Sequence, residues 1–212
     1  MKPRPPRPRS PRGNVRRKIL GAATALFSAR GPDGTSVDDI VRRADCNKRM
    51  VYHYFGSKEG LYRAVLWETY QSIQSFEERV VRRHRQAPAH EFVNRLVGSY
   101  LEFHRTHPRF VNLLAWENLN RGRSIRHLPV RATKSAVLEG LESHFRAAGI
   151  SVDSKDLHQF FVSLSSLCFF TFSNRHTMRQ ILGYDPASRT RLANRQDHVS
   201  AMLNSTQVLG VK

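Results

Sequence analysis

The sequence has 212 residues, enough for one large domain or two small ones, and its apolar content of 40% is adequate for a packed core. Its formal net charge of +18, from 35 Lys and Arg against 17 Asp and Glu, exceeds what solubility requires and favours a polyanionic partner, with nucleic acid ahead of an anionic membrane surface. The two cysteines, Cys46 and Cys168, lack metal-ligand spacing, which argues against a zinc site and a disulfide framework.

Neither a membrane segment nor a secretory signal is recognisable. No apolar run approaches the roughly 18 residues that are needed to span a bilayer. The N-terminus is basic and proline-rich and lacks the apolar segment of a signal peptide. We therefore expect a cytoplasmic protein without a membrane partner.

Residues 1 to 18 concentrate basic charge, with eight Lys and Arg, no acidic residue and five of the ten prolines. Such a composition cannot bury apolar surface, so it predicts a disordered or polyproline-like arm over residues 1–13. Two interpretations fit this arm. It is a solvated tail, or it is an electrostatic arm that lies along phosphates or enters a minor groove.

Three helices are predicted between Asn14 and residue 60, the second and third of about two turns each. In the first, apolar residues recur at intervals of three and four up to the turn "RGPDGT". Thr35 or Ser36 can cap the second helix, and Asn47 can cap the third. The expected buried stripes are Ile19, Ala22, Ala23, Leu26 and Phe27 in the first helix and Val37, Ile40, Val41 and Ala44 in the second. The short connection between the second and third helices predicts a helix-turn-helix.

The third helix combines basic, aromatic and apolar residues. In a helix-turn-helix, the N-terminal residues of the second helix of the motif contact base edges and phosphates, while its opposite face packs inward. We therefore expect Val51 and Phe55 to face the core. The expected exposed polar set is Asn47, Lys48, Arg49, Tyr52 and His53.

The segment "FGSKEGL" predicts the start of the next helix, with Gly56 ending the preceding one and Ser57 as the cap. Lys58 in the first turn is unfavourable for the helix dipole, unless a phosphate oxygen shares the site. The alternative is a lysine that points into water.

The stretch "YHYFGSKEGL", from Tyr52 to Leu61, resembles the tetracycline-repressor (TetR) family of bacterial transcription regulators, and the resemblance extends over about residues 14–66. It implies a three-helix DNA-binding domain, a larger helical ligand-binding and dimerisation domain, and binding as a dimer to near-palindromic operators. By position, it implies that Tyr52 and Lys58 contact phosphates, and that Lys48, Arg49 and His53 reach bases or backbone.

Two residues depart from the family pattern. Asp45 stands where the turn commonly has glycine, but aspartate tolerates the left-handed conformation. Met50 replaces a usual small or hydroxyl residue and can pack on a thymine methyl group. With the two candidate caps included, the candidate DNA-binding residues are Thr35, Ser36, Asn47, Lys48, Arg49, Met50, Tyr52, His53 and Lys58.

Everything downstream is also predicted to be helical, which makes the fold class all-α, with a DNA-binding domain at 14–60 and a helical domain at 61–212. A long helix should reach Pro88, with Leu61, Val65, Ile73, Phe76 and Val80 on its inner stripe. Further helices are expected at 89–106, 109–121, 125–147 and 154–183, and a last one from Pro186 to Leu209. No strand-like alternation and no internal repeat is visible.

The expected helix at 154–183 is apolar almost all round in its middle, which implies a second buried interface besides the core. In the family that the chain resembles, the two final helices pair with their mates in a homodimer. The alternative is that both helices only fill the core of a monomer.

Polar groups embedded in apolar helices are candidates for a ligand pocket. They occur in "LLAWENLNRG" and "FFTFSNRH", and the regions around "WENLNRG" and "QILGYD" are similar to a branch of the family that includes regulators of pyrimidine and nicotinate catabolism. The candidate ligand-binding residues are Trp67, Tyr70, Tyr100, Phe103, Leu113, Trp116, Glu117, Asn120, Phe170 and Asn174. No cofactor and no metal is expected.

Two other classes of protein compete with this interpretation. An enzyme would need a site, and although His104 and His107 are spaced like a helical metal pair, no Glu-flanked zinc motif surrounds them. A non-specific nucleic-acid-binding protein would use the basic front but has little need of about 150 further helical residues. We therefore predict a regulator, a repressor in the simplest case, that binds operator DNA as a homodimer and is released by a small-molecule effector.

Overall fold

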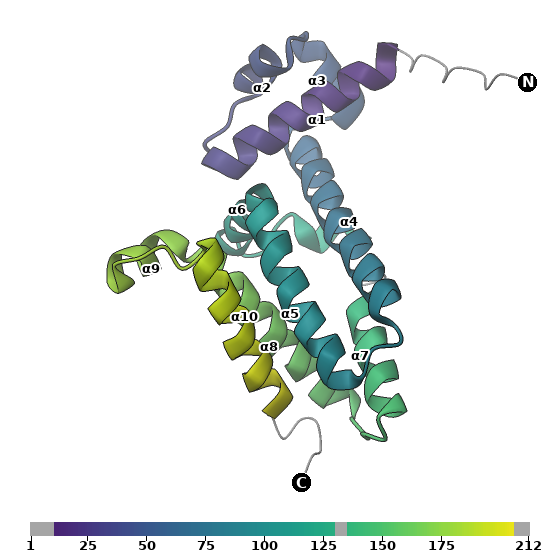
Figure 1. The fold of residues 1–212 in the computed structure, drawn as a ribbon. Coiled ribbons are helices and arrows are strands. Elements are labelled where there is room, and N and C mark those ends of the chain that lie inside the picture. The colour runs from purple at the N-terminus through teal and green to yellow at the C-terminus, as the bar shows by residue number, and fades with distance from the viewer. Residues whose placement is uncertain (1–10, 130–134, 206–212) are drawn as a thin grey trace, which may run out of the picture. The chain divides into compact units, whose positions relative to one another are not determined.

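The computed structural model of the protein describes residues 11–129 and 135–205. Within these ranges every regular element is a helix, which confirms the all-α fold class (Figure 1). The chain forms two compact units, the first made of residues 1–69 and 112–128 and the second of 70–111 and 129–212. The predicted N-terminal arm lies outside the described residues for its first ten positions.

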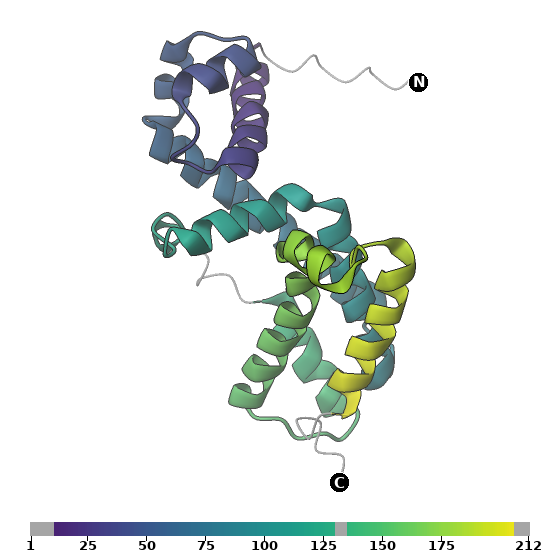
Figure 2. The ribbon, with the colours of Figure 1, turned by 90° about the vertical axis from the view of Figure 1, so that its left-hand side faces the viewer.

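The first unit is built from α1 (Pro11–Arg30), α2 (Val37–Ala44), α3 (Lys48–Phe55) and the first part of α4 (Lys58–His84). Helices α1, α2 and α3 pack against one another (Figure 2). The predicted stripe of α1 is buried throughout, and Ile40, Ala44 and Val51 join it from α2 and α3. Leu61, Val65 and Leu66 of α4 complete this core. Helix α1 begins at Pro11, three residues before the predicted start.

Local capping explains where α2 and α3 begin. Ser36 and Asp39 form a capping box, so Ser36 rather than Thr35 is the cap of α2. The side chain of Asn47 accepts a hydrogen bond from the Arg49 backbone N–H at 2.8 Å, which confirms it as the cap of α3. Between the two helices Asp45 has φ 50° and ψ 60°, the left-handed conformation that was expected for this position.

Helix α6 (Pro108–Leu119) contributes its second half to the first unit. Leu113 is completely buried in the core of that unit. The ring of Trp116 lies against Gly31, which ends α1 with φ +72°. A Cβ atom at Gly31 would lie 2.8 Å from the Trp116 ring, so both the backbone and the space require glycine there.

We expect Gly31→Ala to lower the free energy of unfolding of the first unit by about 2–4 kcal/mol, because backbone strain adds to the clash with Trp116. Gly149→Ala is the matched control, because Gly149 also has a positive φ of +73° but no atom within 4 Å of the added Cβ. Its cost should stay near 1 kcal/mol. Equal losses in chemical denaturation of the two variants would contradict the packing argument.

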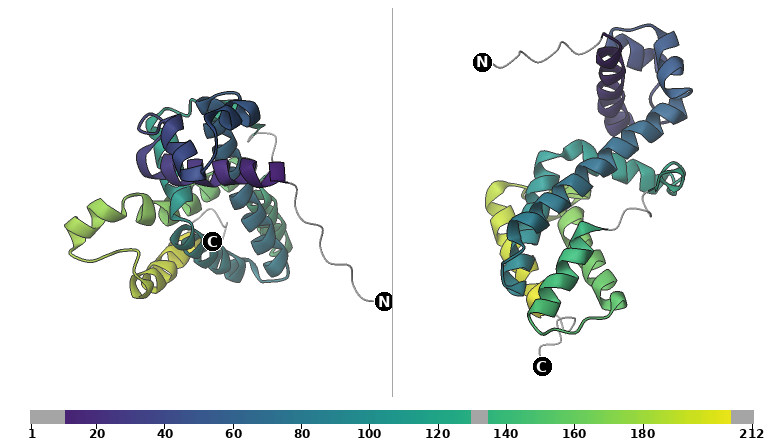
Figure 3. Two further views of the ribbon diagram at one scale, coloured as in Figure 1. Left: turned by 90° about the horizontal axis from the view of Figure 1, so that it is seen from above. Right: turned by 90° about the vertical axis from the view of Figure 1, so that its right-hand side faces the viewer.

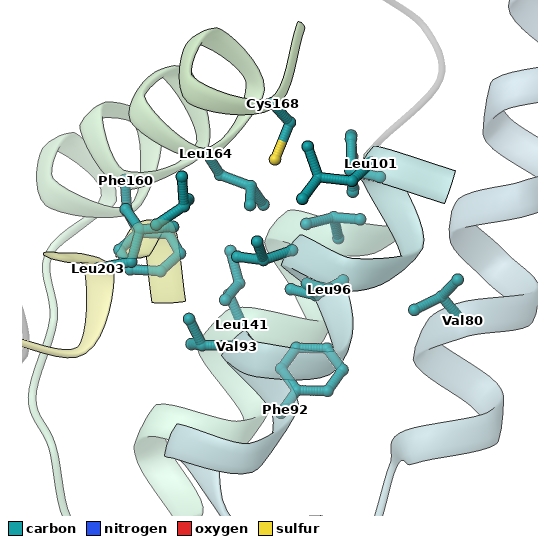
Figure 4. Packing of buried hydrophobic residues seen from close by; sticks show 14 of the residues in the cluster. Val80, Phe92, Val93, Leu96, Leu101, Leu141, Phe160, Leu164, Cys168 and Leu203 are labelled. Atoms are coloured by element: carbon teal, nitrogen blue, oxygen red, sulfur yellow. The ribbon is translucent and has the colours of Figure 1, made fainter. Parts of the chain in front are cut away.

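The second unit contains the rest of α4 with α5 (Ala89–Thr106), α7 (Ala136–Ala147), α8 (Ser154–Ser173), α9 (Arg175–Leu182) and α10 (Arg189–Ser205). Helix α5 is central, because it packs on α7, α8 and α10. Phe92, Leu96, Leu141, Phe160 and Leu164 are at most 1% exposed and form the middle of the core (Figure 4). The short helix α9 stands off from α8 and α10 (Figure 3), and the described structure buries none of its residues.

Two predicted helices are wrong in extent. The expected helix at 125–147 is replaced by a 3₁₀ turn, η1 (Ile125–His127), and by α7, which begins only at Ala136. Pro129 lies between them, and proline has no N–H for a continuing helix. The expected helix at 154–183 is interrupted at Asn174, which ends α8 and precedes α9 with φ −107° and ψ 16°. The last helix, predicted from Pro186, begins at Arg189 and is described up to Ser205; its predicted end at Leu209 lies outside the described residues.

Candidate nucleic-acid interface

Helix α3 presents the residues that the sequence placed on its outer face. Asn47, Lys48, Arg49, Tyr52 and His53 are all exposed, with Tyr52 at 47%. On the opposite face Val51 is completely buried. Phe55 is only half-buried, but its ring packs on the core of the first unit and lies 5.3 Å below the guanidinium of Arg16 in α1. The helix therefore has one polar, cationic side and one side that fixes it to the core.

Lys48 of α3 is ion-paired with a residue of α2. Its ammonium forms an ion pair with Asp38 of α2 at 3.0 Å, and both side chains are largely exposed. The hydrogen bond and charge of Asp38 raise the pKa of Lys48, so the lysine is cationic. The pair links α2 and α3, but it also neutralises one of the charges that α3 could offer to phosphates.

Lys58 does not simply point into water, and its predicted contact with a phosphate stays a prediction. Its ammonium donates hydrogen bonds to the backbone carbonyls of Pro32, at 3.0 Å, and Thr35, at 3.3 Å. The lysine thus ties the segment between α1 and α2 to the start of α4, where Ser57 is the cap. An ammonium has three donors, so one N–H direction is still available to a phosphate oxygen.

The three remaining DNA-binding candidates, Thr35, Met50 and Ser36, differ in how far their side chains reach the surface. Thr35 is 1% exposed, and its hydroxyl donates to the Gly31 carbonyl at 2.8 Å, so this side chain is not on the surface. Met50 is half-buried and packs on the core of the first unit, which leaves only part of its side chain for a base. Ser36 is exposed, but its oxygen already accepts from the Asp39 N–H within the capping box.

The ligand-binding candidates are divided between the two units. Trp67, Leu113, Trp116, Glu117 and Asn120 belong to the first unit, and Tyr70, Tyr100, Phe103, Phe170 and Asn174 to the second. Glu117 is buried and structural, since its Oε1 accepts from the backbone N–H groups of Ser124, at 2.7 Å, and Ile125, at 2.9 Å. Phe170 is 50% exposed on the outer face of α8.

The sequence interpretation missed a buried polar cluster in the second unit. The hydroxyl of Tyr100 donates to Glu77 Oε1 at 2.5 Å, and both residues are buried. His104, one turn after Tyr100, is 4% exposed and surrounded by aromatic rings. Burial raises the pKa of Glu77 to about 7 and lowers the pKa of His104 to about 4, so both side chains favour the neutral form. In the sequence, the feature that indicates this cluster is Glu77, a carboxylate that lies at helical spacing from the apolar residues Ile73 and Val80.

Two kinds of site were sought within the described residues: clusters of metal-ligating side chains and membrane-spanning helices. No group of three or more His, Cys, Asp or Glu side chains there could hold a metal ion. Among the helices at 11–129 and 135–205, none has the length and apolar character to cross a membrane.

Comparison with known proteins agrees with this geometry. Residues 19–65 match the family model of bacterial regulatory proteins of the tetR family, and residues 88–203 match a tetracyclin repressor-like C-terminal domain. The HTH-type transcriptional repressor NicS of Pseudomonas putida is 34% identical over 186 residues, which cover 85% of this chain and 86% of NicS.

Solved structures share the fold. A TetR-family regulator from Mesorhizobium loti aligns with a TM-score of 0.64 at 21% identity, covering 96% of this chain and 98% of that one. The fatty acid degradation regulator FadR from Bacillus halodurans aligns with a TM-score of 0.66 at 15% identity, covering 94% and 97%. The matched families and relatives are transcriptional regulators, not enzymes. The chain therefore belongs to the TetR family of bacterial transcriptional regulators.

Proposed function

We propose that this protein is a ligand-responsive transcriptional repressor that binds a near-palindromic operator as a homodimer and leaves it when a small molecule binds the helical domain. In this proposal residues 14–60 read the DNA, and residues 61–212 bind the effector and the second subunit. The observation that carries it is α3, whose exposed residues are polar and cationic while Val51 anchors the helix to the core. An α-helix of this kind fits the major groove.

The proposed dimer surface lies on α8 and α10. Val162 and Phe170 of α8 are 54% and 50% exposed, and Met202 of α10 is 43% exposed. Because the inner face of α8 already fills the core with Phe160 and Leu164, these outer residues have no role in the core of their own chain. Exposed apolar side chains on such helices support a second subunit as their partner.

Control by an effector would act through the distance between two α3 helices. In a dimer these helices must be spaced by about one turn of DNA, roughly 34 Å, to enter successive major grooves. Helix α4 begins beside α3 in the first unit and ends in the second. A small rotation of α4 would therefore change this spacing and release the DNA.

Arg49→Gln should weaken binding to an operator-like duplex, selected in vitro from random sequences, about 10- to 100-fold, or 1.4–2.8 kcal/mol, because α3 loses a group that reaches bases or phosphates. The control is Arg146→Gln, which removes the same charge from an exposed position on α7. It should change the affinity less than about twofold. Fluorescence anisotropy at two salt concentrations measures both variants.

The same titrations test the alternative of non-specific binding. A sequence-specific regulator retains the selected duplex at a salt concentration that releases random DNA, because base contacts depend little on counterion release. Parallel loss of both duplexes, or equal effects of the two substitutions, would indicate a general electrostatic binder instead.

A further inference from the structure

A surface groove of about 400 Å³ runs between the second half of α4 and α5. The two helices are antiparallel (Figure 1), and their backbones do not approach as closely as α5 approaches α7, α8 and α10. Each helix contributes one stripe of side chains to the groove. The stripe of α4 is Phe76, Arg79, Val80, Arg83 and His84, and the opposite wall is Gly98, Ser99, Glu102, Phe103, Thr106 and His107. Its size lies within the range of small-molecule sites.

One end of the groove is cationic without a compensating acid. Arg79 and Arg83 are exposed and stand four residues apart on the same face of α4. Like charges at this spacing repel each other. Over the residues that the structure describes, neither guanidinium forms an ion pair with a carboxylate. Two neighbouring arginines that lack a carboxylate partner can together bind a bidentate anion such as a carboxylate.

The single carboxylate in the groove wall, that of Glu102, already forms an ion pair with another arginine. Glu102 accepts from Arg105 Nε at 2.7 Å and from Arg105 Nη2 at 2.6 Å. This pairing lowers the pKa of Glu102 and leaves it ionised but neutralised by its neighbour. It therefore offsets little of the positive charge of Arg79 and Arg83.

The other end of the groove is aromatic. The rings of Phe76 and Phe103 lie 4.6 Å apart, and the imidazole of His107 stacks on Phe103 at 4.2 Å with an angle of 13° between the planes. Phe76 and Arg79 are three residues apart, which is about 4.5 Å along a helix axis. A ligand that spans both ends therefore needs a flat ring and an acid group close to it, not a long chain.

We propose that the α4–α5 groove binds a small aromatic carboxylate, with the acid group at Arg79 and Arg83 and the ring beside Phe76, Phe103 and His107. That this ligand is the effector rests on the function proposed above. The coupling follows from α4, which forms one wall of the groove and also supplies the first unit with residues 58–69. A molecule that fills the groove would contact α4, the helix whose first part packs in the same unit as α3.

The test uses the full chain and three probes in isothermal titration calorimetry: benzoate, its neutral isostere benzamide, and acetate. Benzoate should bind saturably with an affinity in the millimolar range or tighter, as expected for a ligand of this size. Benzamide lacks the charge and acetate lacks the ring, so each should bind at least tenfold more weakly. Benzamide binding as tightly as benzoate would overturn the proposal.

A pair of double variants separates the groove from general attraction to a basic protein. Arg79→Gln with Arg83→Gln should weaken benzoate binding at least tenfold. Arg82→Gln with Arg85→Gln removes the same charge from positions that do not line the groove, and should leave binding within twofold. Equal losses in the two double variants would overturn the site. Circular dichroism verifies that all proteins are folded.

Failure of the site and failure of the proposed function have different signatures. If wild-type protein holds a selected duplex but benzoate neither binds nor weakens that complex, the groove proposal is wrong and the regulator remains. If benzoate binds in a manner that depends on Arg79 and Arg83, but no duplex is enriched in the selection, the groove is supported and DNA regulation is not.

Discussion

At pH 8, Glu77→Gln is expected to stabilise the second unit by about 2–3 kcal/mol, although it removes a charged residue that accepts a hydrogen bond. Glu77 is 6% exposed, and burial raises its pKa to about 7, against an ordinary value of 4.5. Above pH 7 the folded protein therefore keeps an ionised carboxylate in its core. A glutamine amide is neutral at every pH, and its carbonyl can still accept from the Tyr100 hydroxyl.

The pH dependence of this effect has a definite sign. Because the pKa of Glu77 is higher in the folded than in the unfolded chain, its contribution to stability is largest below pH 4.5 and is lost as the pH rises to about 7. His104 acts in the opposite direction, since its pKa is lowered to about 4, and its contribution is lost as the pH falls from 6.5 to 4. In the wild-type protein the two residues therefore change the free energy of unfolding in opposite directions between pH 4.5 and 6.5, and their effects largely cancel.

Without the Glu77 carboxylate, the pH dependence that comes from His104 is no longer cancelled. The free energy of unfolding of Glu77→Gln should therefore rise steadily from pH 4 to pH 6.5 and then level off. Urea denaturation followed by circular dichroism at several pH values measures this curve. Glu78→Gln is the control on the exposed side of α4, and should change stability by less than about 0.5 kcal/mol. A Glu77→Gln variant that is no more stable than wild type at pH 8 would show that the carboxylate is well solvated.

Phe27→Ala should destabilise the first unit by about 3–5 kcal/mol, because it leaves a cavity in a core where this ring is fully buried. The two units have separate hydrophobic clusters, with Phe27 in one and Phe160 in the other. Phe160→Ala should therefore weaken the second unit by a similar amount and spare the first. Such selective losses are expected when a chain does not unfold as a single two-state system.

Native-state hydrogen exchange distinguishes the two variants, because it reports stability residue by residue. In Phe27→Ala, amides of α1 to α3 should lose protection while those of α5 and α8 keep it. DNA binding should fall together with the first unit. If both variants lowered protection equally throughout the described residues, the two clusters would have to be treated as one cooperative core.

The sequence predicts the first unit well because its signals are local. Ser36 and Asn47 cap their helices through neighbours two or three residues away, and the α1 stripe follows helical spacing. Lys58 shows the limit of such reasoning. Its ammonium binds carbonyls of residues 26 and 23 positions earlier, a contact that no pattern around Lys58 could reveal.

The second unit is less predictable for physical reasons. Asn174 ends α8 without a proline or glycine to signal the break, and its side chain makes no capping hydrogen bond to α9. Because α8 is rich in phenylalanine on all sides, its sequence does not indicate which rings are buried. In the structure Phe160 lies in the core and Phe170 is exposed. Polar groups near apolar runs occur in ligand pockets, but the same pattern also includes residues with structural contacts, such as Glu117, whose carboxylate accepts from two backbone N–H groups.

The placement of Leu113 limits how the DNA-binding part could be excised. This leucine is completely buried in the core of the first unit, yet it lies more than forty positions after the end of the N-terminal segment of that unit. A fragment that stops at residue 69 would leave a hole at that point and an uncovered Gly31. A chimaera that carries the DNA-binding part of this protein on another regulator would therefore need the second half of α6 as well as the first 69 residues.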